Sequence, residues 1–201
     1  MVGIVFVISG PAGVGKTTLC DRLIGEFSKT VKRVVTVTTR KPRVGEESGR
    51  DYHFLGKEEF LQKVDQGAFI EYECIHDNYY GTLKETILSE IENPDGGDLL
   101  LNIDVNGASS LKKFAKTNKL LQGIVICVFV NPASIKQLKE RLLERGSDDI
   151  AEIEKRLKAA CVEIEKKGQF DFILSSEGRE DDYEKLMKIY LQCSPLHRSD
   201  P

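Results

Sequence analysis

Cysteine, net charge and long apolar runs are all scarce in this sequence. The five cysteines are odd in number, widely spaced and without a C-x-x-C pair, which argues against a disulfide framework and against a zinc site. The formal net charge of −3 gives no support for binding to nucleic acid or to a membrane surface, since such partners usually meet a basic face. We therefore expect free thiols and a small-molecule partner, with no nucleic acid and no membrane.

Targeting signals are also missing from the sequence. Met1 leads directly into an apolar run, without the basic segment and cleavage site of a signal peptide. No apolar run approaches the roughly 20 residues of a membrane span. The 201 residues, 40% hydrophobic and 30% charged, are enough for one large domain that folds alone. We expect a cytoplasmic protein that is a monomer or a small homo-oligomer.

The clearest motif is SGPAGVGKTT, residues 9–18. It matches the pattern G-x-x-x-x-G-K-S/T at Gly10, Gly15, Lys16 and Thr17. A strand-like run at 4–9 precedes it and an amphipathic helix pattern at 16–27 follows it, which indicates a phosphate-binding loop (P-loop) rather than a simple turn. The loop N–H groups would face an anion, Lys16 would reach the β- and γ-phosphates, and Thr17 would offer its hydroxyl to Mg²⁺.

Four apolar runs rich in branched residues alternate with helical patterns: IVFVIS, DLLLNID, GIVICVFV and DFILSS. This alternation predicts an α/β fold with three layers, in which helices cover both faces of a parallel sheet. The second run ends in Asn102 and Asp104, and the P-loop follows the first. Ligands of such sheets gather at the carboxyl ends of strands, so we expect one site at this edge.

Two segments interrupt the alternation. Residues 34–81 hold short strand-like pieces broken by KPRVGEESGR, which predicts an inserted mixed α+β subdomain. Residues 132–167 read as two helices separated by the hinge RGSDD, and such a pair over a P-loop is a candidate lid. We expect Asn131-Pro132 to cap and begin the first helix, and Asp149 with Glu152 to form a capping box for the second.

Arginines outside the loop are candidates for binding phosphates. Arg40 and Arg43, with Tyr52 and Tyr80, could clamp one phosphate monoester, although ordinary surface charge and core aromatics would explain them equally well.

Three further arginines lie in the lid segment. Arg141 and Arg145 are four residues apart on one helix, where their like charges repel unless an anion lies between them. Glu144 is a competing partner for Arg141, so a solvated face remains an alternative. Arg156 falls on the second helix and carries no signal alone.

Several motifs occur in the order found in guanylate kinases: SGPAGVGKTT, TVTTRKPRVGEESGRDYHF, FIEYE, NYYGT, NIDVNGA, LKERLLERG and EKRLKAA. The chain resembles that family over nearly its whole length. The resemblance implies an ATP:GMP phosphotransferase with Mg²⁺ as cofactor, acting in purine nucleotide metabolism. It also implies a division into a core of residues 1–33, 92–131 and 168–201, a GMP-binding subdomain of residues 34–91, and a lid of residues 132–167.

The resemblance also implies roles for individual residues. Those that would hold the transferring phosphoryl group are Lys16, Arg141, Arg145 and Arg156. Those that would bind ATP are Gly10, Pro11, Ala12, Gly13, Val14, Gly15, Lys16, Thr17, Thr18 and Ser176. The GMP phosphate would be bound by Arg40, Arg43, Tyr52 and Tyr80, and the guanine side by Thr36, Glu71, Thr82 and Asp104. The metal would be held by Thr17 and, through water, by Asn102.

The chemistry of Glu71 agrees with a guanine site. Guanine presents N1–H and an exocyclic N2 amine side by side, and one carboxylate can accept from both, whereas adenine has an acceptor at N1 and no amine at C2. The plainer alternative is a surface Glu that alternates with Ile70 and Tyr72 on a strand. Thr82 has a second interpretation as well, because T-x-x-E with Glu85 is the pattern of a capping box.

The chain departs from the family at two positions. Asn102 stands where the family usually has Asp, which bears on metal binding, and Ser176 stands where an Asn usually closes the adenine pocket. We expect transfer of the γ-phosphoryl of Mg-ATP to GMP or dGMP. The alternatives are a P-loop kinase of another monophosphate and a non-catalytic guanylate-kinase-like interaction module.

Overall fold

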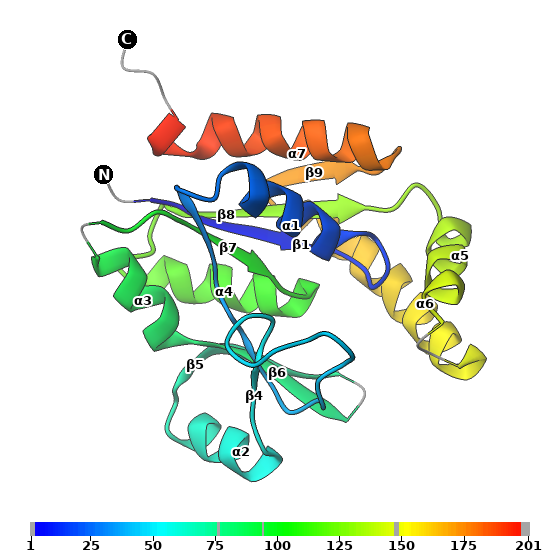
Figure 1. Cartoon of the computed structure of the whole chain (residues 1–201), viewed down its shortest axis with the longest axis horizontal. Coiled ribbons are helices and arrows are strands. Elements are labelled where there is room, and N and C mark those ends of the chain that lie inside the picture. The colour runs from blue at the N-terminus through cyan, green and yellow to red at the C-terminus, as the bar shows by residue number, and fades with distance from the viewer. Residues whose placement is uncertain (1–2, 76, 94, 147–148, 198–201) are drawn as a thin grey trace.

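The core of the structure is a parallel sheet of five strands (Figure 1). The computed structural model describes residues 3–75, 77–93, 95–146 and 149–197. In spatial order the strands are β2 (Val31–Arg33), β7 (Asp98–Asn102), β1 (Val5–Ser9), β8 (Val125–Asn131) and β9 (Phe172–Ser175). Every neighbouring pair in this order is parallel. All five residues of the central strand β1 are buried. Because the P-loop follows β1, it lies in the middle of the carboxyl edge of the sheet.

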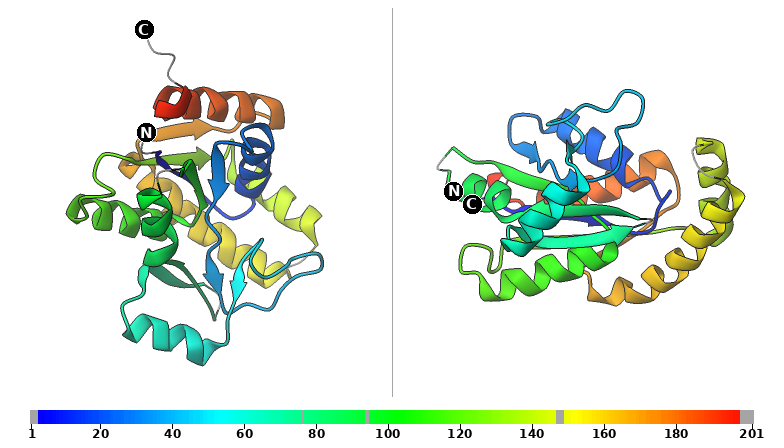
Figure 2. Two further views of the ribbon diagram at one scale, coloured as in Figure 1. Left: turned by 60° about the vertical axis from the view of Figure 1, so that its left-hand side comes forward. Right: turned by 90° about the horizontal axis from the view of Figure 1, so that it is seen from below.

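Helices cover both faces of this sheet (Figure 2, right). One apolar cluster joins α1 (Lys16–Glu26) and α7 (Arg179–Cys193) to one face of the sheet. A second cluster joins α3 (Lys84–Glu92) and α4 (Val105–Thr117) to the other face. The α/β fold with three layers is thus confirmed. No helix among the described residues is long and apolar enough to cross a bilayer.

A second, smaller sheet lies below the core in Figure 1. Its strands in order are β4 (His53–Phe54), β3 (Val37–Thr38), β6 (Asn78–Leu83) and β5 (Phe69–Ile75). The β3–β4 pair is parallel and the other two pairs are antiparallel. Helix α2 (Lys57–Asp65) packs on this sheet through the fully buried Phe60. The sheet pairs its strands in both directions and carries a helix, as expected for a mixed α+β insertion at residues 34–81.

Two helices form the arm at the right of Figure 1, α5 (Ile135–Arg145) and α6 (Ile150–Glu165). The cap of α6 is confirmed, because the Asp149 side chain accepts from Glu152 N at 2.8 Å. The expected start of α5 at Asn131-Pro132 is wrong. Ser134 caps that helix instead, with its hydroxyl accepting from Gln137 N, because Asn131 is still the last residue of β8. Two short 3-10 helices, η1 (Lys166–Gln169) and η2 (Pro195–His197), complete the elements of the described chain. The five cysteines, all among the described residues, form no disulfide; Cys20 and Cys127 are buried, whereas Cys74 and Cys161 are exposed.

Candidate active site

The P-loop joins β1 to α1 at the carboxyl edge of the core sheet. Gly15 is the N-cap residue of α1 with φ of 107°, a left-handed conformation that glycine adopts without strain. At Gly10, a Cβ would lie 2.5 Å from Val130 O, so only glycine allows the loop to approach β8 this closely. The Lys16 ammonium donates to Gly10 O at 2.5 Å and to Pro11 O at 3.0 Å. The loop therefore holds its own lysine at the place where its backbone curls.

Two carboxylates face the Lys16 ammonium. Burial lowers the pKa of Lys16, and the charges of Glu163 on α6 and of Asp104 after β7 act in the opposite direction. Burial also raises the pKa of Glu163, which the Lys16 charge opposes. Because these groups act on one another, the end of α6, the residue after β7 and the P-loop lie near one another.

Helix α5 lies directly on the P-loop. Arg141 Nη1 donates to Val14 O at 3.0 Å, while Leu138 and Leu142 are buried beneath it. Arg141 thus lies close to the loop, as a phosphate-binding role requires. Its hydrogen-bond partner here is the Val14 carbonyl, not the Glu144 carboxylate that was the alternative. Arg156 Nε lies 3.5 Å from Glu152 Oε1 on α6. The side chain of Arg145 lies outside the described part of the structure.

Asn102 and Thr17 meet beside the loop. Asn102 ends β7, pairs with Ile8 of β1, and donates from Nδ2 to Thr17 Oγ1 at 3.2 Å. We predicted these two residues at one metal site, and the structure places their side chains in contact.

The second cluster contains the tyrosines and arginines that were expected to bind a phosphate monoester. The Arg40 guanidinium lies 5.4 Å from the centre of the Tyr52 ring, and the Tyr52 and Tyr80 rings are 6.1 Å apart in an edge-on arrangement. Burial raises the pKa of Tyr52, which the charges of Arg40 and Arg43 oppose. Arg40, Tyr52 and Tyr80 therefore lie together, with the charge of Arg43 acting on Tyr52, and their role as a phosphate clamp stays a prediction.

Glu46 joins this cluster and was missed from the sequence. Its carboxylate receives two bonds from Arg40, at 2.8 and 2.9 Å, and a third from Arg43 N at 2.7 Å. The only signal for it was an acidic residue six positions after Arg40 in the same basic loop.

Glu71 is buried, with 7% of its surface exposed, so the surface alternative for it is wrong. A bulge between Phe69 and Glu71 breaks the alternation of β5. Ile70 packs against the apolar cluster that contains α4, and the Glu71 carboxylate also faces α4, where a Cβ on Gly107 would lie 2.7 Å from Oε2. Ile70 and Glu71 thus both meet the part of the core that includes α4, and a side chain at position 107 would force the carboxylate to shift.

The surroundings of Glu71 make its carboxylate harder to ionise. Burial is the main cause that raises the pKa of Glu71 to about 7; the charges of Asp104 and Glu73 act in the same direction, and the hydrogen bond from Thr82 acts against it. Thr82 Oγ1 donates to Glu71 Oε1 at 2.5 Å. The charge of Asp104 acts on the pKa values of both Glu71 and Lys16, so Asp104 lies near enough to each to influence its ionisation.

The threonines expected near guanine line up across the second sheet. Thr82 pairs with Glu71, while Thr36 directly precedes Val37, which pairs with Gly81, the residue before Thr82. Thr36 and Thr82 are both buried. The alternative capping box of Thr82 is wrong, because Leu83 is the N-cap residue of α3 and has no side-chain cap.

Asp104 and Ser176 both have partners within the fold. Asp104 caps α4, with Oδ1 accepting from Asn106 N at 2.7 Å and Gly107 N at 2.9 Å. The Ser176 hydroxyl donates to Asp182 Oδ2 at 2.6 Å and is almost fully buried. Ser176 follows β9 at the same sheet edge as the P-loop, but its side chain points at α7.

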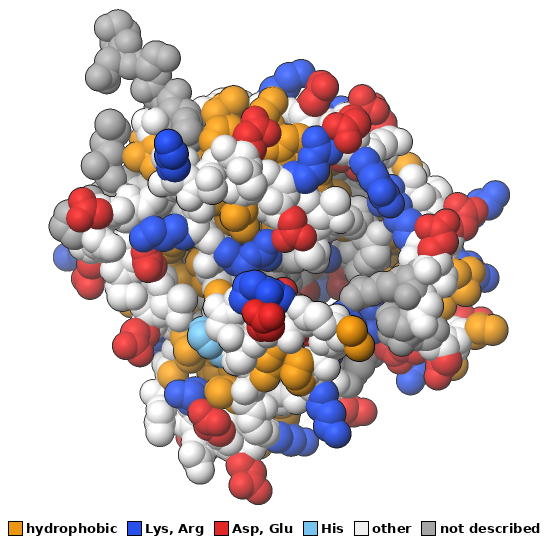
Figure 3. All heavy atoms as spheres, viewed as in Figure 1, with side chains coloured by type: hydrophobic (Ala, Val, Ile, Leu, Met, Phe, Trp, Pro, Cys, Tyr) orange, Lys and Arg blue, Asp and Glu red, His pale blue; other side chains and the backbone are white. Residues whose placement is uncertain are grey.

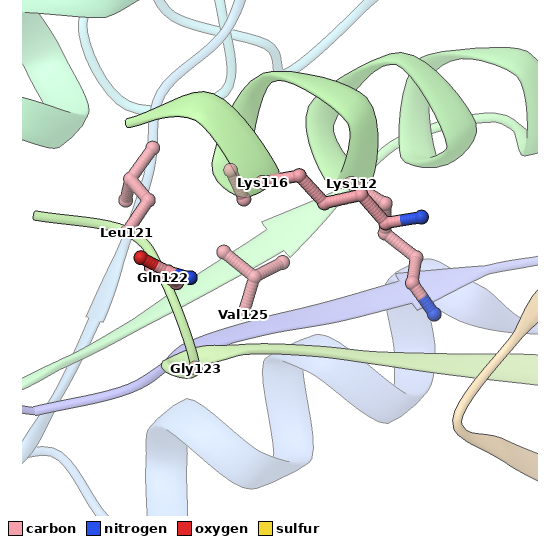
Figure 4. A pocket seen from close by; sticks show the side chains of 7 residues that line it. Lys112, Lys116, Leu121, Gln122, Gly123 and Val125 are labelled. Carbon is pink, nitrogen blue, oxygen red and sulfur yellow. The ribbon is translucent and has the colours of Figure 1, made fainter. Parts of the chain in front are cut away.

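Lys and Arg side chains gather near the centre of the face in Figure 3, with acidic side chains beside them. A separate pocket of about 220 Å³ lies between the end of α4 and the start of β8, with Lys112, Lys116 and Val125 in its wall (Figure 4). Val125 pairs with Val5 at the amino end of β1, so this pocket opens at the edge of the sheet opposite the P-loop. It is therefore not the site described above.

Comparisons with known proteins agree with this geometry. A family model described as guanylate kinase matches residues 3–192. The chain is 41% identical over 175 residues to the guanylate kinase of Clostridioides difficile (strain 630), covering 87% of this chain and 80% of that protein. It is 38% identical over 190 residues to the guanylate kinase of Thermotoga maritima, covering 94% and 86%. The crystal structure of guanylate kinase from Anaplasma phagocytophilum superposes with a TM-score of 0.70 at 28% identity, covering 94% of this chain and 84% of that one. The chain belongs to the guanylate kinase family.

Proposed function

We propose that this protein transfers the γ-phosphoryl of Mg-ATP to GMP or dGMP, giving ADP and GDP or dGDP, as a step of purine nucleotide metabolism. The observation that supports the choice of acceptor is the buried Glu71 carboxylate. The charge of Asp104 acts both on this carboxylate and on Lys16 of the P-loop. Membership of the family supports the class of reaction.

Glu71 would select guanine by accepting from N1–H and from the N2 amine. Thr82 fixes one carboxylate oxygen at 2.5 Å, and Gly107 leaves the other facing α4. Thr36 and Asp104 would complete the contacts around the base. Adenine would offer the buried carboxylate no donor of its own, which is the kind of mismatch that discriminates strongly.

The acceptor phosphate would lie among Arg40, Arg43, Tyr52 and Tyr80. A phosphate monoester has its second pKa near 6, so GMP is largely a dianion at neutral pH and needs no general base. The work left to the protein is alignment and the neutralisation of charge.

The donor phosphates would lie on the loop from Gly10 to Thr18, with the adenine toward Ser176. Lys16 would exchange the carbonyls of Gly10 and Pro11 for the migrating phosphoryl group. We propose that residues 132–167 act as a lid in which Arg141 already lies on the P-loop, and whose closure adds Arg145 and Arg156 and excludes water that would hydrolyse ATP. Residues 34–91 would act as the GMP-binding unit.

The residues beside the loop fit a hydrated Mg²⁺. The Thr17 hydroxyl and the Asn102 amide meet at 3.2 Å, and an amide turned over presents its oxygen instead of Nδ2. Both groups then offer the oxygen atoms that Mg²⁺ prefers. Within the described residues, no three His, Cys, Asp or Glu side chains cluster to hold a metal, which suits an ion held mainly by phosphates and water. When bound, Mg²⁺ would neutralise charge on the β- and γ-phosphates.

The test is ADP formation from ATP with a panel of acceptors: GMP, dGMP, AMP, CMP, UMP and dTMP. We expect rapid ADP formation with GMP and dGMP, with the product identified as the diphosphate by chromatography. Lys16→Ala, purified in parallel, controls for contaminating kinases. A faster reaction with another monophosphate would identify a different P-loop kinase. Failure with every acceptor, in a folded protein, would favour an interaction module.

A further inference from the structure

Glu46 forms a bidentate ion pair with Arg40. Arg40 Nη1 and Nη2 donate to Oε2 and Oε1 at 2.8 and 2.9 Å, and Nη1 also donates to Lys41 O at 2.8 Å. Both side chains are well shielded, with 14% of Arg40 and 19% of Glu46 exposed. A paired, shielded guanidinium has a fixed plane, unlike the exposed ion pairs elsewhere in this loop.

Glu46 also closes the loop that carries Arg43. Its Oε2 accepts from Arg43 N at 2.7 Å, while its own N–H donates to Arg43 O at 3.0 Å. One side chain therefore sets the backbone at Arg43 and the plane of Arg40 together. Beyond this pair, Arg40 N donates to Thr38 Oγ1 at 3.1 Å, which ties the start of the loop to β3.

The arrangement leaves the guanidinium able to bind a second anion. A guanidinium has five N–H donors, and Glu46 and Lys41 O take three of them. Tyr80 lies close enough to share a hydrogen bond with Arg40, and Tyr52 lies over its face at 5.4 Å. An incoming phosphate would thus meet an Arg40 whose orientation is already fixed.

We propose that Glu46 is a positioning residue for the acceptor phosphate: it orients Arg40 and Arg43 without itself contacting GMP. This inference rests on the proposed function. Holding both arginines before the ligand arrives lowers the entropy lost on binding.

A carboxylate so near a phosphate also repels it. The hydrogen bond from Arg40 is the main cause that holds the pKa of Glu46 below its usual range, so Glu46 is ionised at neutral pH. Its charge is matched by Arg40 in direct contact, whereas the phosphate would meet the remaining donors of Arg40 and those of Arg43. We therefore expect orientation to outweigh repulsion.

The test compares the binding of GMP and of guanosine by calorimetry in Glu46→Gln. Glutamine keeps the shape but removes the charge and turns one acceptor into a donor facing Arg40. We expect the dissociation constant for GMP to rise about tenfold or more, the size of a lost charge-assisted hydrogen bond, while that for guanosine stays unchanged. The matched control is Glu47→Gln, a neighbour whose side chain is 70% exposed and pairs with Arg50; it should bind both ligands as the wild type does.

Three results would overturn the proposal. Unchanged GMP binding in Glu46→Gln would show that Glu46 does not orient the clamp, and tighter GMP binding would show that it acts as a competing anion. An equal loss for GMP and guanosine would mean a general disturbance of the fold. If Glu46→Gln does not fold, Glu46→Asp keeps the charge with a shorter reach and should weaken GMP alone. If the wild type bound AMP with the same affinity as GMP, the proposed function would be contradicted instead. Failure of the proposed function is therefore distinguishable from failure of the role assigned to Glu46.

Discussion

The affinity for guanine should fall as the pH drops below neutrality. Glu71 must be ionised to accept from both guanine donors, and burial raises the pKa of this carboxyl to about 7 in the ligand-free protein. The N–H donors of guanine stabilise only the carboxylate, so binding lowers the pKa of Glu71 and releases a proton near neutral pH. Acid removes the form that binds, and alkali leaves it intact.

The size of the effect follows from that pKa. About half of Glu71 is ionised at pH 7 and about one molecule in ten at pH 6, so the dissociation constant should rise about twofold and then about tenfold above its value at pH 8.5. Each further unit of acid should add about another factor of ten.

Guanosine is the ligand for this assay because the phosphate of GMP titrates near pH 6 itself. Calorimetry from pH 5.5 to 8.5 would give the dissociation constant, and two buffers with different ionisation enthalpies would give the number of protons released. Glu71→Gln should bind more weakly and show no pH dependence in this range. A wild-type affinity that stays constant from pH 8 to pH 6 would refute the reasoning.

Three substitutions test other parts of the site. Lys16→Ala should fold and lose turnover by roughly several hundredfold, because it removes the charge aimed at the migrating group; near-normal turnover in a steady-state assay would contradict that role. Asn102→Asp should lower the free Mg²⁺ needed for half-maximal rate, since a carboxylate beside the Thr17 hydroxyl adds attraction for the ion; identical half-saturation points in Mg²⁺ titrations of both proteins would remove position 102 from the metal site. Gly107→Ala would place a Cβ 2.7 Å from Glu71 Oε2, so the KM for GMP should rise about tenfold with little change in the KM for ATP; an unchanged KM for GMP would show that the carboxylate can move aside.

The P-loop could be predicted because its signal is local. The glycines, the lysine and the flanking strand and helix all lie within one short stretch, and the backbone conformation of Gly15 follows from its residue type. The parallel sheet followed equally from the alternation of apolar runs. The edge strand β2 was missed, because only three of its residues pair with β7 and only Val31 of them is buried.

The burial of Glu71 could not come from strand periodicity. A period of two places Ile70 and Glu71 on opposite faces, whereas a bulge at this point lets Ile70 pack on the core cluster while Glu71 faces Gly107 of α4. Only the resemblance to a family indicated the guanine site. The roles of Gly107 and Glu46 depend on contacts across the fold and within a loop, which residue spacing does not encode.

Helix caps were partly predictable. Asp149 lies in a polar hinge and caps α6 as expected. The prediction for α5 was wrong because Asn131 continues β8, and that for Thr82 was wrong because its hydroxyl bonds to Glu71 across the sheet. In both cases strand pairing displaced the local signal.

The central claim, that Glu71 reads the donors of guanine, is tested most directly by a ladder of acceptors. GMP presents two N–H donors to Glu71, IMP presents only N1–H, and AMP presents neither. The measurement is kcat/KM for the three acceptors at saturating Mg-ATP and pH 8, in the wild type and in Glu71→Gln. The wild type should prefer GMP to AMP by at least about a thousandfold with IMP between them, and Glu71→Gln should lose most of that preference. Equal kcat/KM values for GMP and AMP in the wild type, or an unchanged ladder in Glu71→Gln, would contradict it.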